Sequence, residues 1–377
     1  MDLSLAERDR RWSAINAVME AEDLGVVVAH SDYGDCATLQ RYISNFRSSY
    51  DHMVAMLFST TECELILAHP GGIPIAKMIS WATEGYPMAP SPVDGGKATV
   101  AGQMAAQFLK RGIKRIGVAG LELFPSGWKS TIEQAIPGVT FVDVWDQLHH
   151  MRLVKSDEEQ ALIRESARIS DLAWERLPEF YQSGRKCCEI LADVEQVLRS
   201  EGCEDFFNLC MALPMLQYGL DRNPYSALPV NEGVPHLIEV SPRYAGYFAQ
   251  QTMPVVSGGR IPDDMRAAYQ AVNAARARGL EIAKPGTDLI EVGEAVFAQL
   301  NKDGFEAPSP SFGHAIGLEL EDNHIDGSSL ILEEGMTFIF HPFAAGHPAV
   351  MRADTYLITA TGAERLTTGS TDILELD

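Results

Sequence analysis

Long apolar segments and basic residues are both scarce in this chain. None of its apolar runs approaches the ~20 residues that a membrane-spanning helix needs. Its 30 lysines and arginines are outnumbered by 52 aspartates and glutamates, which gives a formal net charge of −22. Nucleic acids and anionic membranes both favour proteins with a surplus of basic residues, so we expect neither as a partner.

Cysteine is also sparse, with six in 377 residues. Cys187 and Cys188 are adjacent and the others are scattered without CxxC spacing, so neither a disulfide framework nor a redox motif is indicated. The segment Met1–Arg8 has no basic stretch followed by an apolar core, so we expect no secretory signal. Together these absences predict a cytoplasmic protein with reduced thiols.

The first part of the chain alternates helical and strand-like segments. Apolar spacing predicts helices over 5–22 and 104–111, and strands over 24–29, 53–58, 65–68 and 115–119. This alternation is typical of an α/β domain, which we place at residues 1–152.

The rest of the chain, residues 153–377, is predicted to form a second domain with two similar halves. Ser156 and Glu159 have the spacing of a capping box, so a long helix should begin there. A second helix follows, then strands around 237–240 and 247–256. The same order recurs from Asp263, with helices over 263–283 and 289–302. Two such helix–helix–strand–strand units imply a pseudo-symmetric domain with a cleft between its halves.

Four segments of the second domain share the order and spacing of a known family. They are the strand pair His236–Thr252, the stretch Gly-His-Ala-Ile-Gly at 313–317, the run Gly-Met-Thr-Phe-Ile-Phe-His-Pro at 335–342, and Met-Arg-Ala-Asp-Thr at 351–355. These segments resemble those of the creatinase and prolidase-like pita-bread metallopeptidases. Met151–Glu159 also resembles the start of the catalytic domain in that family.

The resemblance covers essentially the whole chain and implies its fold. It predicts an α/β (α+β) protein, with an N-terminal creatinase-like α/β domain at residues 1–152 and a pseudo-twofold pita-bread catalytic domain at residues 153–377. It further implies a homodimer in which the N-terminal domain of one subunit reaches the partner's site. Arg47 would then bind an anionic substrate group across the dimer.

The positions that hold metal ligands in this family carry different residues here, with one exception. The family's set is Asp, Asp, His, Glu and Glu, and the matching residues are Glu239, Gln250, His314, His341 and Ala353. Two divalent cations need several anionic oxygens, with bridging carboxylates holding the ions together. Ala353 has no donor atom, and the ligand charge falls from minus four to about minus one. We therefore expect no metal and no other cofactor.

Four residues are candidates for catalysis on the basis of this resemblance. Without a metal, His314 becomes an imidazole that can transfer protons near neutral pH, and His341 can act with it as an acid–base pair. Glu239 keeps a carboxylate that can orient a histidine or act as a base. Tyr225 matches, within a few residues, a proposed acid/base histidine of creatinase-like enzymes, and its phenol can donate to a developing oxyanion. A structural role is the competing interpretation of each.

Six residues are candidates for substrate binding: Arg47, Gln250, Glu321, Arg352, Phe312 and Phe343. Gln250 offers a neutral donor and acceptor, and Glu321 stands where many relatives carry a second histidine. Arg352 can bind a substrate carboxylate or form a salt bridge. The two phenylalanines favour an apolar or aromatic ligand, with a plain hydrophobic core as the alternative.

These residues favour a metal-independent, creatinase-like hydrolase or lyase that acts on a small molecule. It would cleave a C–N or C–C bond by His-based acid–base catalysis, with retro-aldol cleavage or elimination on a hydroxyalkyl-aryl substrate among the candidates. Two alternatives stay open. One is a single-metal, Xaa-Pro-peptidase-like hydrolase that uses Glu239, His314 and His341 as ligands. The other is a catalytically dead pita-bread module that binds peptides.

Overall fold

The computed structural model describes residues 3–31, 38–47, 53–67, 70–90, 98–212, 227–307, 310–324, 328–346 and 350–377. The chain divides into two compact units, Asp2–Arg152 and Leu153–Asp377. In the described ranges, no helix has the length and apolar character needed to cross a membrane.

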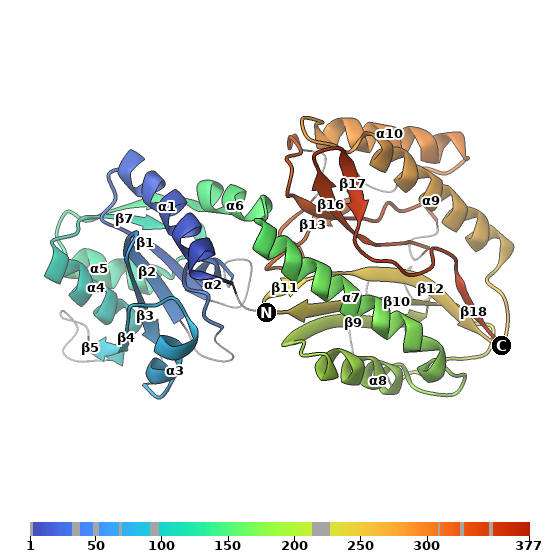
Figure 1. Ribbon diagram of the computed structural model, residues 1–377, viewed down its shortest axis with the longest axis horizontal. Helices are drawn as coiled ribbons and strands as arrows, with labels where there is room; N and C mark the ends of the chain where they lie inside the picture. The colour runs from blue at the N-terminus through green and yellow to red at the C-terminus, as the bar shows by residue number, and fades with distance from the viewer. Residues whose placement is uncertain are drawn as a thin grey trace. The chain divides into compact units, whose positions relative to one another are not determined.

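The first unit is built on a six-stranded sheet in the order β4-β3-β2-β1-β7-β8 (Figure 1). Its strands are β1 (Val26–Ser31), β2 (Met53–Ser59), β3 (Glu62–Leu67), β4 (Glu84–Pro87), β7 (Arg115–Val118) and β8 (Thr140–Asp143). Strands β1, β7 and β8 run parallel, whereas β1 pairs antiparallel with β2. The sheet is therefore mixed, as in many α/β domains.

Helices and short elements complete the first unit. They are α1 (Leu5–Ala21), α2 (Leu39–Ser44), α3 (Gly72–Ile79), α4 (Val100–Arg111), the 3-10 helix η1 (Leu121–Leu123), α5 (Ser126–Ala135), α6 (Trp145–Leu153), and the strand pair β5 (Ala89–Pro90) and β6 (Ala98–Thr99). Helix α4 begins at Thr99, whose hydroxyl accepts from the Gly102 amide, and ends at Gly112, which has φ +66°. Its buried Met104 and Phe108 pack in a core with strand residues such as Val28.

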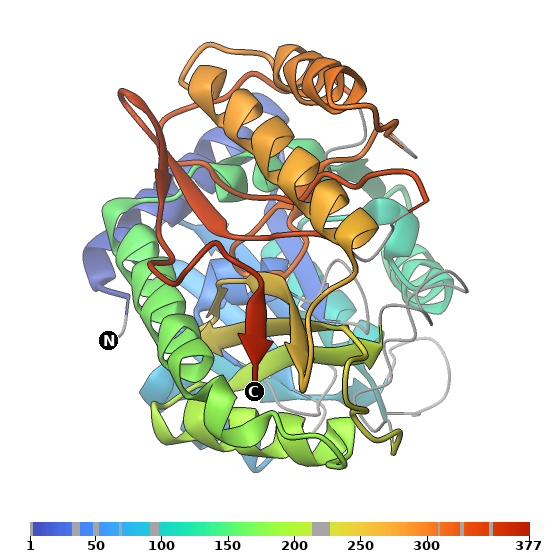
Figure 2. The same ribbon diagram turned by 90° about the vertical axis from the view of Figure 1, so that its right-hand side faces the viewer.

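In the second unit, the first half consists of two helices and a sheet. The elements are α7 (Asp157–Phe180), α8 (Cys187–Ser200), β9 (Asp205–Ala212), β10 (His236–Tyr244), β11 (Tyr247–Phe248) and β12 (Gln251–Ser257), joined by β18 (Leu374–Leu376) from the end of the chain. Figure 2 shows α7 and α8, in green, together on one side of these strands. The predicted capping box of Ser156 and Glu159 at the start of α7 is confirmed.

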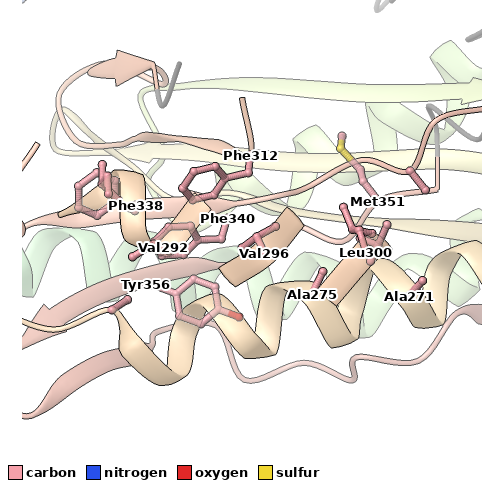
Figure 3. Close-up of a cluster of buried hydrophobic side chains, with 14 of the residues drawn as sticks. Ala271, Ala275, Val292, Val296, Leu300, Phe312, Phe338, Phe340, Met351 and Tyr356 are labelled. Atoms are coloured by element: carbon pink, nitrogen blue, oxygen red, sulfur yellow. The ribbon is translucent and has the colours of Figure 1, made fainter. Parts of the chain in front are cut away.

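The other half repeats this plan. Its elements are α9 (Asp263–Ile282), α10 (Leu289–Lys302), β13 (Gly313–Ala315), β14 (Asn323–His324), β15 (Thr337–Phe340), β16 (Thr355–Thr359) and β17 (Gly362–Arg365), with the strands in the order β14-β13-β15-β16-β17. Figure 3 shows Val292 and Val296 of α10 toward aromatic rings of the sheet, and Leu300 near Met351, all in one buried cluster. Burying each such aliphatic side chain contributes roughly 1.5–3 kcal/mol.

The elements of the second unit agree closely with the sequence predictions. Helix α10 spans the predicted range, and α9 ends one residue before the predicted end. The predicted single strand over 247–256 is wrong, because β11 and β12 are separated at Ala249 and Gln250. The backbone N–H of Gln250 donates to the Thr355 hydroxyl, 2.8 Å away, instead of to a neighbouring strand of its own sheet.

Candidate functional site

Side-chain alternation along β10 and β12 determines which residues face the second half of the unit. On β10, Ile238 and Val240 pack in the core formed with α7 and α8, so Glu239 and Ser241 point to the opposite face. Thr252 of β12 lies directly opposite Glu239 in the strand register. The inner face of the first sheet is therefore polar at this point.

The second sheet presents His314 on its corresponding inner face. Phe338 and Phe340 of β15 pack against the α9 and α10 side (Figure 3), so Ile339 points the other way. His314 lies opposite Ile339 in the register of β13 and β15, and paired residues share a face. His314 is buried, with 4% of its surface exposed.

Two sets of hydrogen bonds join the inner faces of the two sheets. Thr252 and Ala353 exchange two backbone hydrogen bonds of 3.0 Å each. The Thr355 hydroxyl accepts from the Gln250 amide and donates to the Gln250 carbonyl oxygen at 3.1 Å. Five residues match the metal-ligand positions of the family, and these contacts bring three of them, Glu239, Gln250 and Ala353, close together.

The Glu239 carboxylate is held by neutral donors. Gln250 Nε2 donates to Glu239 Oε1 at 2.5 Å, and the Ser241 hydroxyl donates to the same oxygen at 3.1 Å. Glu239 and Gln250 are 3% and 5% exposed. The side-chain oxygen of Gln250, Oε1, and the Thr252 hydroxyl are buried and have no hydrogen-bond partner among the described residues. A buried acceptor without a partner costs about 1–3 kcal/mol, so both oxygens favour a ligand with N–H or O–H groups.

His314 and His341 form a second cluster. Their ring centroids are 5.2 Å apart with an interplanar angle of 60°, and the Phe343 ring lies 5.3 Å from that of His341. The Phe312 carbonyl oxygen accepts from the His341 amide at 2.8 Å, which fixes the chain just after β15. His314 Nδ1 lies 3.0 Å from the Ala315 carbonyl oxygen, which can only accept. The proton therefore belongs on Nδ1, and Nε2 is the nitrogen that can take up a proton.

This donor set does not fit two divalent cations. Glu239 is the one carboxylate among the five matching residues, and it already accepts from an amide and a hydroxyl. Ala353 packs with the apolar side chains of Phe248, Ile316 and Ile339, where a bridging carboxylate would be needed. Within the described ranges, no three His, Cys, Asp or Glu side chains are arranged to hold a metal ion.

Two glycines near His314, Gly313 and Gly317, are required by the close packing around them. A Cβ on Gly313 would overlap the backbone carbonyl oxygen of Ile339 in the neighbouring strand. A Cβ on Gly317 would overlap the side chains of Asp322 and Lys155, which form a buried ion pair of 3.0 Å. Both glycines therefore permit the packing that positions His314.

We expect Gly313→Ala to lower the free energy of unfolding by at least about 1–3 kcal/mol, because β13 and β15 must move apart. Gly369→Ala is the matched control, since its Cβ would meet only atoms at ordinary contact distances of 3.7 Å or more. Urea unfolding of both variants measures the difference. Equal stabilities would contradict this role of Gly313.

Arg352 requires a correction. It is completely buried, and its Nε and one terminal nitrogen donate to the two carboxylate oxygens of Asp354 at 2.8 and 2.6 Å. Its other terminal nitrogen lies 3.7 Å from the Met253 sulfur. Arg352 therefore forms a salt bridge, which was the competing interpretation. The prediction that it binds a substrate carboxylate is wrong.

The remaining candidates are placed as follows. Phe312 is a core residue whose ring stacks on Phe340 at 6.0 Å, so its packing is that of the hydrophobic-core alternative. Glu321 lies in a partly exposed turn rather than a strand. Arg47 is exposed in the first unit, and its role across a dimer stays a prediction. Tyr225 lies outside the described residues.

Sequence reasoning missed Thr252 and Asp354. Thr252 follows Gln250 by two residues, so strand alternation could have placed it on the same face. Asp354 directly follows two residues named in the sequence analysis, Arg352 and Ala353. No spacing rule indicates that arginines from three segments form ion pairs with it.

The sequence pattern of metallopeptidase family M24 matches residues 161–360, more than half of the 377-residue chain. The chain belongs to metallopeptidase family M24. This M24 protein is 26% identical to the Xaa-Pro dipeptidase of Pyrococcus horikoshii, over 68% of its own length and 74% of that relative. It is 25% identical to the ectoine hydrolase of Halomonas elongata, over 66% of its length and 68% of that relative.

Solved structures confirm the predicted pita-bread fold of this M24 protein. An X-Pro aminopeptidase from Thermotoga maritima superposes with a TM-score of 0.84 at 21% identity, covering 97% of this chain and 99% of that one. An Xaa-Pro dipeptidase from Bacillus anthracis superposes with a TM-score of 0.81 at 20% identity, covering 98% and 100%. The creatinase and prolidase-like fold class is thus established.

Proposed function

We propose that this M24 protein is a hydrolase that cleaves a C–N bond of a small molecule and uses His314 and His341, rather than a dinuclear metal centre, to move protons. The observation that carries this proposal is the pair of neighbouring imidazoles on a scaffold whose other ligand positions are an amide, a methyl group and one carboxylate that accepts hydrogen bonds from neutral donors.

Hydrolysis of a C–N bond requires two proton transfers. A base removes a proton from the attacking water, and an acid delivers one to the leaving nitrogen, since an unprotonated amine is a poor leaving group. His314 Nε2 is suited to the first step because Nδ1 is committed to the Ala315 carbonyl oxygen. His341, whose ring is a direct neighbour, is assigned the second step. Such positioned proton transfers contribute about 100- to 10,000-fold each.

The polar cluster on the facing sheet supports a substrate with N–H or O–H groups. Gln250 Oε1 and the Thr252 hydroxyl lack partners among the described residues, and both are buried. Glu239 adds a negative charge beside them, so a cationic or strongly polarised N–H group is favoured there. In this proposal Gln250 has the binding role expected of it, whereas Glu239, expected to be catalytic, contributes to binding.

The relatives support hydrolysis more than lyase chemistry. Several relatives are named as dipeptidases and one as an ectoine hydrolase, and none of these names describes C–C cleavage or elimination. The ectoine hydrolase also shows that a relative of this chain need not be named a peptidase. We therefore retain C–N hydrolysis and do not carry the retro-aldol alternative further.

A second candidate is the single-metal, Xaa-Pro-peptidase-like hydrolase, with Glu239, His314 and His341 as ligands. The names of the Pyrococcus relatives, both Xaa-Pro dipeptidases, favour it. The contacts of Glu239 weigh against it, since this carboxylate already accepts from Gln250 and Ser241 and belongs to a different sheet from the two imidazoles. A peptide-binding module without activity would lack turnover of any kind.

Metal analysis and chelation separate these candidates. We expect the purified protein to contain far less than one metal ion per chain, and to release amine or ammonia at an unchanged rate after dialysis against 1,10-phenanthroline. The substrate panel combines small amides, amidines and Xaa-Pro dipeptides, with elemental analysis on the same sample. Stoichiometric metal together with loss of turnover on stripping would establish the single-metal hydrolase instead.

A further inference from the structure

A pocket of about 570 Å³ lies along α9 and the C-terminal segment. Arg266, Gln270, Asn273 and Arg276 line it from α9, at the spacing of one helix face. Asp372 and Glu375 line it from the C-terminal segment. Arg266 and Glu375 form an ion pair with each other, so they contribute little net charge to the pocket.

The region behind this pocket carries unbalanced positive charge. Three arginines pair with the single carboxylate of Asp354: Arg276 at 2.6 Å, Arg352 at 2.6 Å and Arg365 at 3.0 Å. Arg352 and Asp354 are fully buried, Arg276 is 6% exposed, and the Arg365 side chain is 27% exposed. One negative charge thus faces three positive charges, and buried charge without a counter-charge is unfavourable.

Arg276 connects this cluster to the pocket. One of its terminal nitrogens donates to Asp354 at 2.6 Å and the other to Asn273 Oδ1 at 3.0 Å. A guanidinium has five N–H donors, so three of them have no partner among the described residues. Arg276 also lines the pocket, so its side chain borders any molecule that occupies it.

We propose that this pocket binds a small oxyanion, a carboxylate or phosphate group, through Arg276. The fork of a guanidinium matches the oxygens of both groups, and such charge-assisted hydrogen bonds are about twice as strong as neutral ones. The bound anion adds to the counter-charge of Asp354, and the Asp372 carboxylate, which also lines the pocket, opposes its binding. This site is independent of His314 and His341, and so of the proposed hydrolysis.

Thermal unfolding with defined anions tests the proposal on the full-length protein. Inorganic phosphate and acetate are compared with chloride at matched ionic strength, because salt also screens charges nonspecifically. At a concentration ten times its dissociation constant, the oxyanion is expected to raise Tm by about 3–5 °C above the value in chloride. The larger of the two shifts identifies the preferred oxyanion.

Gln270→Glu locates the effect. Gln270 is exposed at the pocket and the substitution adds a negative charge there, so the oxyanion-dependent shift should disappear. Ala274→Glu adds the same charge to an exposed position of α9 that does not line the pocket, and should keep the shift. If Gln270→Glu does not fold, Asn273→Asp replaces it. Equal shifts in chloride, or a shift that persists in the pocket variant, would overturn the proposal.

Discussion

Replacing His314 by asparagine should lower kcat about 100- to 10,000-fold, the range that a positioned proton-transfer group contributes. An asparagine amide can still donate to the Ala315 carbonyl oxygen, as His314 Nδ1 does, but it has no nitrogen that can take up a proton. The variant therefore removes the chemistry while keeping the local hydrogen bond. Steady-state kinetics on the best substrate from the amine-release panel measure the effect.

The double variant of His314 and His341 makes the test specific. Because the two rings are direct neighbours acting on one substrate, the double variant should be little slower than the worse single variant. His150→Asn is the control, since His150 is exposed and belongs to the first unit, and its activity should match the unsubstituted protein. If His314→Asn retained near-normal kcat with an intact fold, His314 would not be a catalytic residue.

The sequence predicted the second unit well because its signals are local. A capping box requires only Ser156 and Glu159 three residues apart, and the long apolar stripe of α10 requires no information from elsewhere. Strand limits were harder, since the break before β12 depends on a hydrogen bond between Gln250 and Thr355, which are far apart in sequence. That contact could not be inferred from one strand alone.

The candidate site shows the same division. The pairing of His314 with His341 followed from the family resemblance, and the structure places their rings side by side. The position of Arg352 did not follow, because a sequence cannot show whether an arginine points to a substrate or to a buried carboxylate two residues away. The glycines around His314 are ambiguous in the same way. A backbone that lies close to a neighbouring strand and one that lies close to a ligand both require glycine.

Asp354→Ala is expected to lower the free energy of unfolding by about 3–5 kcal/mol, the cost of removing one partner from a buried ion pair. The carboxylate accepts from Arg352, Arg276 and the Thr367 hydroxyl, and forms a further ion pair with Arg365. Without it, buried guanidinium groups lose their counter-charge. Urea denaturation measures the change, and Asp372→Asn, at an exposed position, is the control that should shift stability by less than about 0.5 kcal/mol.

The pH dependence of this difference has a definite sign. Burial alone would raise the pKa of Asp354, but the positive charges and hydrogen bonds of Arg352, with Arg276 and Arg365, outweigh burial and lower this pKa below its usual value. A carboxyl group whose pKa is lower in the folded state stabilises the fold above the unfolded value of about 3.9 and loses that contribution as the pH falls further. The gap between the unsubstituted protein and Asp354→Ala should therefore be constant near neutral pH and shrink below about pH 4. A gap that stayed constant through this range would mean that the carboxylate charge does not stabilise the arginine cluster.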